Sequence, residues 1–490
     1  MVSDTAPAAY VDKDALRTQF AAAMSGMYRR EVPLYGDLID IVRETNEAML
    51  GGANTKAQPS NVTGIQANIE RLTQERHGAI RLGTPYELRT MKRVFEVLGM
   101  HPIGYYDLSI AGLPMHATCF RPLQVSSLEI NPFRVFTTLL RPELLASEEA
   151  RQLSLELLEK RNIFSNVLLI MLDVADIQGG RLKKEQSETF IKEAISTFSW
   201  QPVAAATFDQ YQLLKAEHPI LADIACFQSA HINHLTPRTL DILAVHSAMK
   251  KAGMAAKDAI EGPPGRECPI LLRQTSFLAL EEAVSFRNMN VHGSQKAMIE
   301  AGHKARFGEI EERGAAVTPK GRALYDKLLW ESKKLSAGAA PAEMDAITTK
   351  VFKEFPDTWK QLRLQGLIYC EFHLKQDLIM SARDLDIKNG PILEQLVSMK
   401  IVEAIPITYE DFLPFSAAGI FQSNLQTECS SEKCAPGVNR SVADSKGLEK
   451  AMETEILDLD KWYSSVQTRS LEKLSESLGF TLGELMLNNE

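Results

Sequence analysis

The chain has 490 residues, of which 45% are hydrophobic and 24% are charged, and its formal net charge is −9. This composition is typical of an ordinary globular protein and excludes the disordered and fibrous classes. The negative charge and the lack of a long Lys/Arg block argue against nucleic acid as a partner. A small molecule is therefore the expected partner.

The cysteines and the N-terminal residues indicate the cellular compartment in which the protein is expected. Six cysteines are spread too thinly for a secreted disulfide scaffold, which predicts a reducing environment. Cys429 and Cys434 could form a local disulfide or half a metal site, but no second Cys/His pair has zinc-finger spacing. The first residues do not form a signal segment, and no apolar stretch reaches the roughly 18 residues of a membrane span. We expect a cytoplasmic protein without a membrane partner.

The N-terminal part of the chain is predicted to be helical. Over residues 12–50, apolar side chains such as Leu16, Phe20 and Met24 recur at steps of three and four. The stretch 51–60 is rich in Gly, Pro and small polar residues and reads as a loop.

Two stretches of the chain share one order of elements. From His77, an extended run to Leu82 is followed by a helix that starts at Thr84-Pro85 and by extended runs from Ile103. A comparable order returns from Ile232, which predicts two βαβββ-type modules. The second copy comprises an extended run 232–236, a helix 240–252 and extended runs 270–277, 283–287 and 305–313.

The expected organisation has four parts. Between the modules, 148–160 and 184–198 are predicted helices, whereas 167–172 fits either a strand or a helix. The parts are a helical N-terminal segment 1–60, a βαβββ core 61–320 with a helical insertion at about 145–225, a helical and mixed segment 321–427 that packs on the core, and a loose linker with a C-terminal helix 428–490.

A set of metal ligands is predicted from side-chain parity along the strands. In 305–313, Glu309 and Glu311 share one face, and Glu309 at the strand centre is the better ligand. His231 and His234 differ by three and face opposite sides, so at most one of them binds metal. With His77, two histidines and one carboxylate would leave positions open for substrate and oxygen, which favours Fe(II).

An anion-binding residue is predicted on the same strand as the first histidine. His77 and Arg81 are four residues apart and share a face. Their Cα atoms would be about 13 Å apart in a strand at roughly 3.3 Å per residue, a span that a small dicarboxylate could bridge. Arginine suits this role because its planar guanidinium binds a carboxylate through two hydrogen bonds.

These segments resemble the 2-oxoadipate dioxygenase/decarboxylase (hydroxyglutarate synthase) family, an iron-dependent branch of the vicinal-oxygen-chelate superfamily. The likeness covers most of the chain, from about residue 70 to 425. The segments that carry it are RHGAIR (76–81), GYYDL (104–108), HINHLTPR (231–238), RQTSF (273–277), RFGEIEERG (306–314) and SAAGIF (416–421).

The resemblance implies an α+β, vicinal-oxygen-chelate-like fold, with two βαβββ-type modules forming a curved sheet around the metal and added helical segments. It implies Fe(II) held by His77, His234 and Glu309, with Arg81 on the substrate. The choice of His234 over His231 also fits a likeness of 234–241 and 309–313 to segments of 4-hydroxyphenylpyruvate dioxygenase.

Three further substrate contacts are expected. Gln274 and Ser416 are candidates for hydrogen bonds to the substrate or to the metal ligands. Phe415 stands where the family pattern has a smaller aliphatic residue that touches the substrate.

The implied reaction is the oxidative decarboxylation of 2-oxoadipate with O2 to 2-hydroxyglutarate and CO2, a step of lysine breakdown. Two alternatives stay open because one fold hosts several chemistries. The first is a metal-dependent isomerase or lyase, and the second is a metabolite-binding protein without turnover. The oligomeric state does not follow from the sequence.

Overall fold

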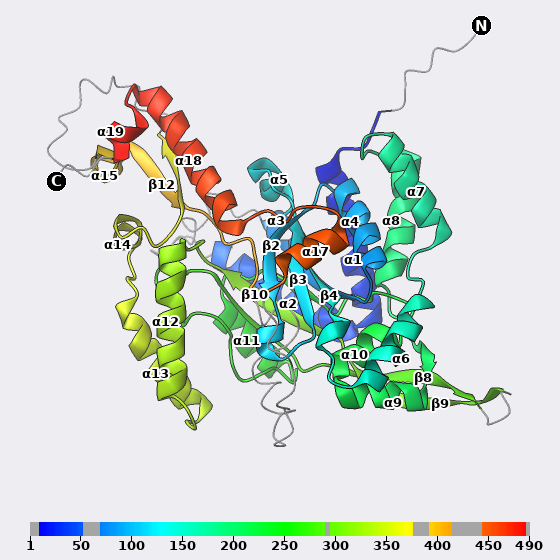
Figure 1. Ribbon diagram of the computed structural model, residues 1–490. Coiled ribbons are helices and arrows are strands. Elements are labelled where there is room, and N and C mark those ends of the chain that lie inside the picture. Colours follow the sequence, from blue (N-terminus) through cyan, green and yellow to red (C-terminus); the bar gives the residue numbers. More distant parts are fainter. Residues whose placement is uncertain (1–8, 52–68, 290–294, 376–391, 414–442, 487–490) are drawn as a thin grey trace, which may run out of the picture.

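The computed structural model describes residues 9–51, 69–289, 295–375, 392–413 and 443–486. A mixed sheet of seven strands lies at the centre of the molecule, with helices around it (Figure 1). The strands of this sheet are β1 (Arg76–Leu82), β2 (His101–Asp107), β3 (Met115–Arg121), β4 (Arg134–Leu140), β6 (His234–Pro237), β7 (Leu272–Ser276) and β10 (Phe307–Arg313).

The order of the strands shows how two modules join. Across the sheet the order is β2-β3-β4-β1-β6-β10-β7. Strand β1 of the first module therefore lies beside β6 of the second module, and these two strands form the junction. Each module has a parallel pair, β1 with β4 and β6 with β10, and the modules meet through the antiparallel pair β1 and β6. This is the expected α+β fold of vicinal-oxygen-chelate type, and the prediction of the fold class is confirmed.

The first module follows the predicted order closely. Helix α4 (Pro85–Val97) separates β1 from β2, and Thr84 caps it in a capping box with Glu87. The helix starts there because the Thr84 hydroxyl accepts from the Glu87 N–H while the Glu87 carboxylate accepts from the Thr84 N–H.

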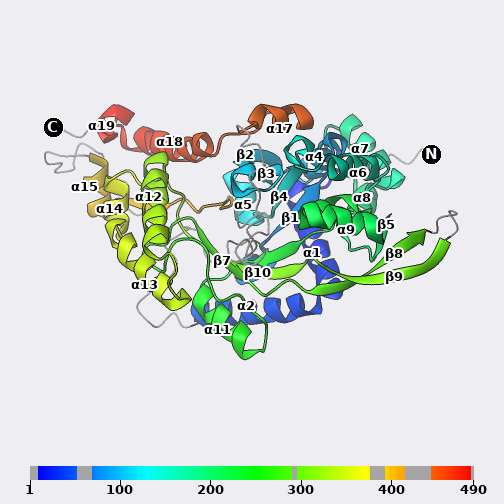
Figure 2. The same cartoon turned by 60° about the horizontal axis from the view of Figure 1, so that its bottom comes forward.

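The second module departs from the predicted bounds. Strand β6 begins at His234 rather than Ile232, and helix α11 (Ile242–Lys251) follows it. The run predicted at 283–287 lies in β8 (Glu281–Met289), which does not join the central sheet. It pairs instead with β9 (Gln295–Lys304) on one edge and β5 (Val203–Thr207) on the other. With a neighbour on each edge, β8 is the middle strand of a separate three-stranded sheet. Figure 2 shows the β8–β9 hairpin projecting from the body.

A large apolar core supports one face of the central sheet. It joins residues of β1 and β4 to side chains of the surrounding helices. Residues 167–172, for which the sequence allowed either a strand or a helix, belong to a helix. The helices that contribute to this core include α1 (Lys13–Glu31), α2 (Pro33–Gly51), α4, α7 (Asn166–Ile177), α8 (Lys184–Phe198), α11 and α17 (Ser445–Met452).

Tyr28 of α1 ties this helical layer to the second module. The side chain is fully buried, and its hydroxyl donates to the backbone carbonyls of Asn233 at 3.0 Å and Phe307 at 2.8 Å. Phe307 is the first residue of β10, and Asn233 directly precedes β6. The N-terminal helix therefore fixes the two strands at the point where they become parallel neighbours.

The remaining elements surround the other sides of the sheet. The segment between the modules contains η3 (Pro142–Leu144), α6 (Glu148–Glu159), α9 (Phe208–Glu217) and α10 (Pro219–Ala225) in addition to α7, α8 and β5. The later segment forms a separate layer at the left of Figure 1. It contains α12 (Pro319–Leu335), α13 (Pro341–Val351), η4 (Phe352–Glu354), α14 (Trp359–Leu364), β11 (Cys370–Leu374), α15 (Ile392–Ser398), β12 (Val402–Pro406), α18 (Leu459–Leu478) and α19 (Leu482–Met486). Three short helices, α3 (Ile69–Gln74), η2 (Ser109–Ala111) and α5 (Val125–Ile130), complete the described elements.

Two sequence predictions can be compared directly with the structure. Across the described ranges, no helix combines the length and the apolar character that a membrane span requires. Cys429 and Cys434 lie outside the described residues, and the four cysteines inside them, at positions 119, 226, 268 and 370, are buried and unpaired with one another.

Gly78 marks a close approach between the two modules. It lies on β1 opposite Leu235 of β6. A Cβ built on it would overlap Cδ1 of Ile232 and lie 2.9 Å from the backbone oxygen of His234. The strands can pair at this point only because residue 78 has no side chain.

We expect Gly78→Ala to lower the free energy of unfolding by about 1–3 kcal/mol, because overpacking forces the strands apart. Denaturant titration would measure the change. Gly51→Ala is the matched control, since a Cβ on Gly51 meets nothing within 4 Å and the helix tolerates alanine. An equal stability of both variants would contradict this account of the junction.

Candidate metal centre

Strand register brings three polar side chains into one row across the junction of the modules. His77 on β1 lies opposite Thr236 on β6. On the other side of β6, Phe307 and Gly308 of β10 pair with His234 and Leu235, so Glu309 comes next to Thr236. His234 is two residues from Thr236 and shares its face. The register therefore gathers His77, His234 and Glu309 on one face of the sheet.

The three side chains form a compact and fully buried cluster. One ligand atom from each of His77, His234 and Glu309 can be chosen so that all lie within 4.8 Å of one another. Nε2 of His77 lies 3.1 Å and Nε2 of His234 3.9 Å from Oε1 of Glu309. Among the described residues this is the one group of His, Cys, Asp and Glu side chains with the spacing of a metal site.

The electrostatics of the cluster fit a bound cation. Burial, with a smaller contribution from the Arg81 charge, holds the pKa of His234 well below its usual range, so this imidazole stays neutral, as a ligand must be. Neither ring nitrogen of His234 has a hydrogen-bond partner in the described part of the chain. Burial raises the pKa of Glu309, a tendency that a cation would reverse.

A second carboxylate lies beside the first histidine. Nδ1 of His77 lies 3.1 Å from Oε2 of Glu311, which leaves Nε2 directed toward Glu309. The Arg134 guanidinium donates to both oxygens of Glu311, at 3.1 and 2.7 Å. Although burial alone would raise it, the pKa of Glu311 is held well below its usual range by Arg134 and Arg313. A charged Glu311 is the kind of partner that fixes the tautomer and orientation of a metal-binding histidine.

Thr236 and Gln274 contact the carboxylate of Glu309. The Thr236 hydroxyl donates to Oε1 of Glu309 at 3.0 Å. Nε2 of Gln274 lies 3.5 Å from Oε2 of the same carboxylate, and Gln274 is fully buried. Gln274 is thus beside the predicted metal ligand, in a place consistent with the predicted hydrogen-bonding role. Phe415 and Ser416, the two other predicted substrate contacts, lie outside the described residues.

Arg81 lies farther along β1 and makes a partly buried ion pair. Its Nη1 is 2.5 Å from Oδ2 of Asp223 on α10. Arg81 is four residues from His77 on β1, so the two side chains leave the same face of the sheet.

The two histidines of the 231–238 segment belong to different clusters. His231 precedes β6, and its Nε2 lies 3.1 Å from Oδ1 of Asp223. His234 lies with His77 and Glu309. The two side chains therefore have different partners, and the choice of His234 as the metal ligand stays a prediction.

Several residues of the site did not emerge from the sequence as candidates. Thr236 shares the parity of His234, so parity could have identified it as a neighbour of the ligands. Glu311 was grouped with Glu309 by parity, but its contact with His77 was not expected. Lys257 gave no such signal because it lies in the loop after α11. Lys257 is buried, and its backbone N–H donates to the Ser276 carbonyl. Burial lowers the pKa of its ammonium group to about 8, although the charges of Glu261 and Glu309 act in the opposite direction.

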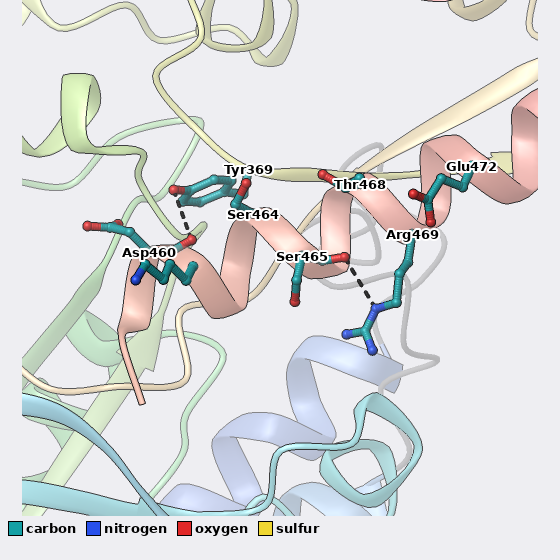
Figure 3. A pocket seen from close by; sticks show the side chains of 8 residues that line it. Tyr369, Asp460, Ser464, Ser465, Thr468, Arg469 and Glu472 are labelled. Carbon is teal, nitrogen blue, oxygen red and sulfur yellow. Dashed lines mark hydrogen bonds between the residues drawn. The ribbon is translucent and has the colours of Figure 1, made fainter. Parts of the chain in front are cut away.

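A surface groove lies elsewhere and contains none of these residues. Figure 3 shows it along α18, with Tyr369 at one end and Glu472 at the other. The Tyr369 hydroxyl donates to the Asp460 carbonyl at 3.4 Å, and Nε of Arg469 donates to the Ser465 carbonyl at 3.2 Å. These contacts are local to the helix and its neighbour, so the groove adds nothing to the chemistry of the buried cluster.

The fold and the cluster together define a class: a vicinal-oxygen-chelate-like protein with a candidate metal site where its two modules meet. The family model described as 2-oxoadipate dioxygenase/decarboxylase matches residues 20–424. The chain therefore belongs to this family, which confirms the resemblance seen in its motifs.

Curated relatives and solved structures support the membership over nearly the whole chain. A 2-oxoadipate dioxygenase/decarboxylase of Pseudomonas putida is 45% identical over 474 residues, which are 96% of this chain and 98% of the relative. Its namesake in Escherichia coli is 44% identical over 94% of this chain and 98% of the relative. The crystal structure of the hydroxyglutarate synthase from Pseudomonas putida in complex with 2-oxoadipate superposes with a TM-score of 0.83 at 42% identity, covering 96% of this chain and 99% of that one.

We expect Glu311→Gln to weaken metal binding by roughly 10-fold to 100-fold, because His77 loses the charged partner that orients its ring. Titration against a chelating dye would measure the affinity. Glu312→Gln is the matched control, since Glu312 is the next residue on the opposite face and accepts from the Ile242 N–H. Equal affinities in both variants would contradict the orienting role of Glu311.

Proposed function

We propose that this protein is a non-haem Fe(II) dioxygenase that converts 2-oxoadipate and O2 into 2-hydroxyglutarate and CO2. The atoms balance, because the carbon lost from the 2-oxo acid leaves as CO2 and the two atoms of O2 are divided between the new carboxylate and the new hydroxyl group. No second oxidisable acid is therefore consumed. In the cell, this reaction would serve lysine breakdown in the cytoplasm.

The observation that carries the proposal is the buried cluster of His77, His234 and Glu309 in a member of this family. Two histidines and one carboxylate are the ligand set of many Fe(II) oxygenases, and they leave coordination positions for substrate and O2. Zinc also binds such a set, but zinc has no redox chemistry. The activity named for the relatives, which includes both oxygenation and decarboxylation, favours iron.

Iron bound at this cluster would supply O2 activation and polarise the 2-oxo acid. The protein would contribute a fixed geometry for its three ligands. Thr236 holds Oε1 of Glu309, and Glu311 faces Nδ1 of His77, so both ligands are preset before metal arrives. The complete burial of all three ligands keeps bulk water away from the reacting centre.

Arg81 is the proposed contact for the far carboxylate of the substrate. Four residues of β-strand separate it from His77, about 13 Å between Cα atoms at roughly 3.3 Å per residue. Both side chains leave the same face of β1 and shorten this distance. A six-carbon dicarboxylate could therefore have its 2-oxo acid end at the metal and its other end at the guanidinium. Holding both ends fixes which carbon lies next to the metal, and small misplacements there cost rate.

The test is oxygen consumption by anaerobically Fe(II)-loaded protein given 2-oxoadipate, with 2-oxoglutarate as the comparison. We expect one O2 consumed and one CO2 released for each 2-oxoadipate. His234→Ala should abolish both, a loss of at least about 100-fold, because it removes a metal ligand. An oxygen electrode and trapped CO2 provide the two measurements.

His373→Ala is the matched control, since that histidine lies on β11 with its side chain 54% exposed and should turn over normally when changed. Metal binding without oxygen uptake would instead favour an isomerase or lyase, and failure of the cluster to bind metal would favour a metabolite-binding protein. Either result would overturn the proposal.

A further inference from the structure

A second buried polar cluster surrounds the side chain of Asp223. This carboxylate is 5% exposed and is contacted from three directions. Oδ2 pairs with Nη1 of Arg81 at 2.5 Å, while Oδ1 lies 3.1 Å from Nε2 of His231 and 3.0 Å from Nε2 of His303. The cluster continues outward, because Nδ1 of His303 lies 3.0 Å from the Tyr211 hydroxyl.

The members of the cluster come from separate parts of the fold. Asp223 lies on α10 in the segment between the modules, and His303 lies on β9 of the small sheet. Arg81 belongs to β1 of the central sheet. The segment between the modules and the β8–β9 hairpin therefore converge on one arginine of the candidate active site.

Aromatic packing holds the two histidines in place. The Trp200 ring stacks on His303 at 5.9 Å between centroids with 10° between planes, and it meets His231 edge-on at 4.8 Å. Both rings are thus fixed against one indole, so the nitrogens that face Asp223 have little freedom.

Asn233 contacts the same guanidinium nitrogen as Asp223. In the amide orientation that satisfies its surroundings, its side-chain nitrogen donates to the Ala79 carbonyl at 3.3 Å and its oxygen accepts from Nη1 of Arg81 at 2.9 Å. Its backbone N–H also donates to the Ala79 carbonyl, at 3.0 Å. Asn233 is next to His234, so the arginine and the metal cluster share one rigid segment.

We propose that Asp223, held by His231 and His303, is a positioning residue that fixes the Arg81 guanidinium for the far carboxylate of the substrate and thereby sets the preference for a dicarboxylic 2-oxo acid. The inference rests on the function proposed above. An unrestrained arginine side chain has several rotamers, and ordering it on binding would cost affinity. The ion pair orders it before substrate arrives.

The arrangement is that of an orienting network rather than of a second metal site. Asp223 places one oxygen between two imidazoles at hydrogen-bond distance and the other oxygen on Arg81. Its pKa is well below the usual range, since His231 and Arg81 outweigh the effect of burial, so the carboxylate is charged and can accept from all three groups.

Binding of two acids to metal-loaded protein without oxygen tests the inference. The acids are 2-oxoadipate and 2-oxohexanoate, which has the same chain length but no far carboxylate. We expect Asp223→Asn to weaken calorimetric binding of 2-oxoadipate on the order of 10-fold to 100-fold and to leave 2-oxohexanoate within about twofold. A general structural defect would weaken both acids alike and would overturn the proposal.

A double-mutant cycle shows whether Asp223 acts through Arg81. In an Arg81→Gln background, Asp223→Asn should cause no further loss of 2-oxoadipate binding, because coupled residues are not additive. Additive losses would overturn the proposal. If the wild type binds 2-oxoadipate but Asp223→Asn binds it equally well, only the positioning role fails. If the wild type binds neither acid, the proposed function fails as well.

His303 gives a second pair of variants in case Asp223→Asn does not fold. His303→Gln places an amide nitrogen near the position of Nε2 and should retain selectivity for 2-oxoadipate over 2-oxohexanoate. His303→Leu removes the donor and should reduce that selectivity at least several-fold. Equal selectivity in the two variants would overturn the proposal.

Discussion

The antiparallel pairing of β1 with β6 is the constraint on which the rest of the structure depends. It sets His77 opposite Thr236, and the parallel pairing of β6 with β10 then brings Glu309 to the same row. A shift of one residue would turn the polar side chains to the opposite face. The close approach at Gly78 and the two hydrogen bonds from Tyr28 oppose such a shift. The candidate metal centre is thus a consequence of how two modules join.

Charge compensation is the second requirement, because the site is buried. An unpaired charge in the interior is costly, and each carboxylate near the site has a guanidinium or imidazole partner. Glu311 pairs with Arg134, and Asp223 pairs with Arg81. Glu75 shows the same effect: burial would raise its pKa, but Arg313, Arg238 and Arg71 lower it to about 2. Glu309 differs because burial raises its pKa, which makes it the carboxylate that a cation would complete.

Local sequence signals predicted the elements of the first module. The Thr84-Pro85 start marked α4, and parity grouped Glu309 with Glu311, both of which face His77. What could not be predicted depends on pairings between distant segments. The place of β8 in a second sheet depends on β5, about 80 residues earlier in the chain. Asp223 carried no signal either, since its partners Arg81 and His303 are brought to it only by tertiary packing.

The measurement that tests the central claim most directly is anomalous diffraction at the iron edge from crystals of the Fe(II)-loaded protein grown without oxygen. The account predicts one iron peak, located between His77, His234 and Glu309. A peak between His231, His303 and Asp223, or no ordered iron at either cluster, would contradict it.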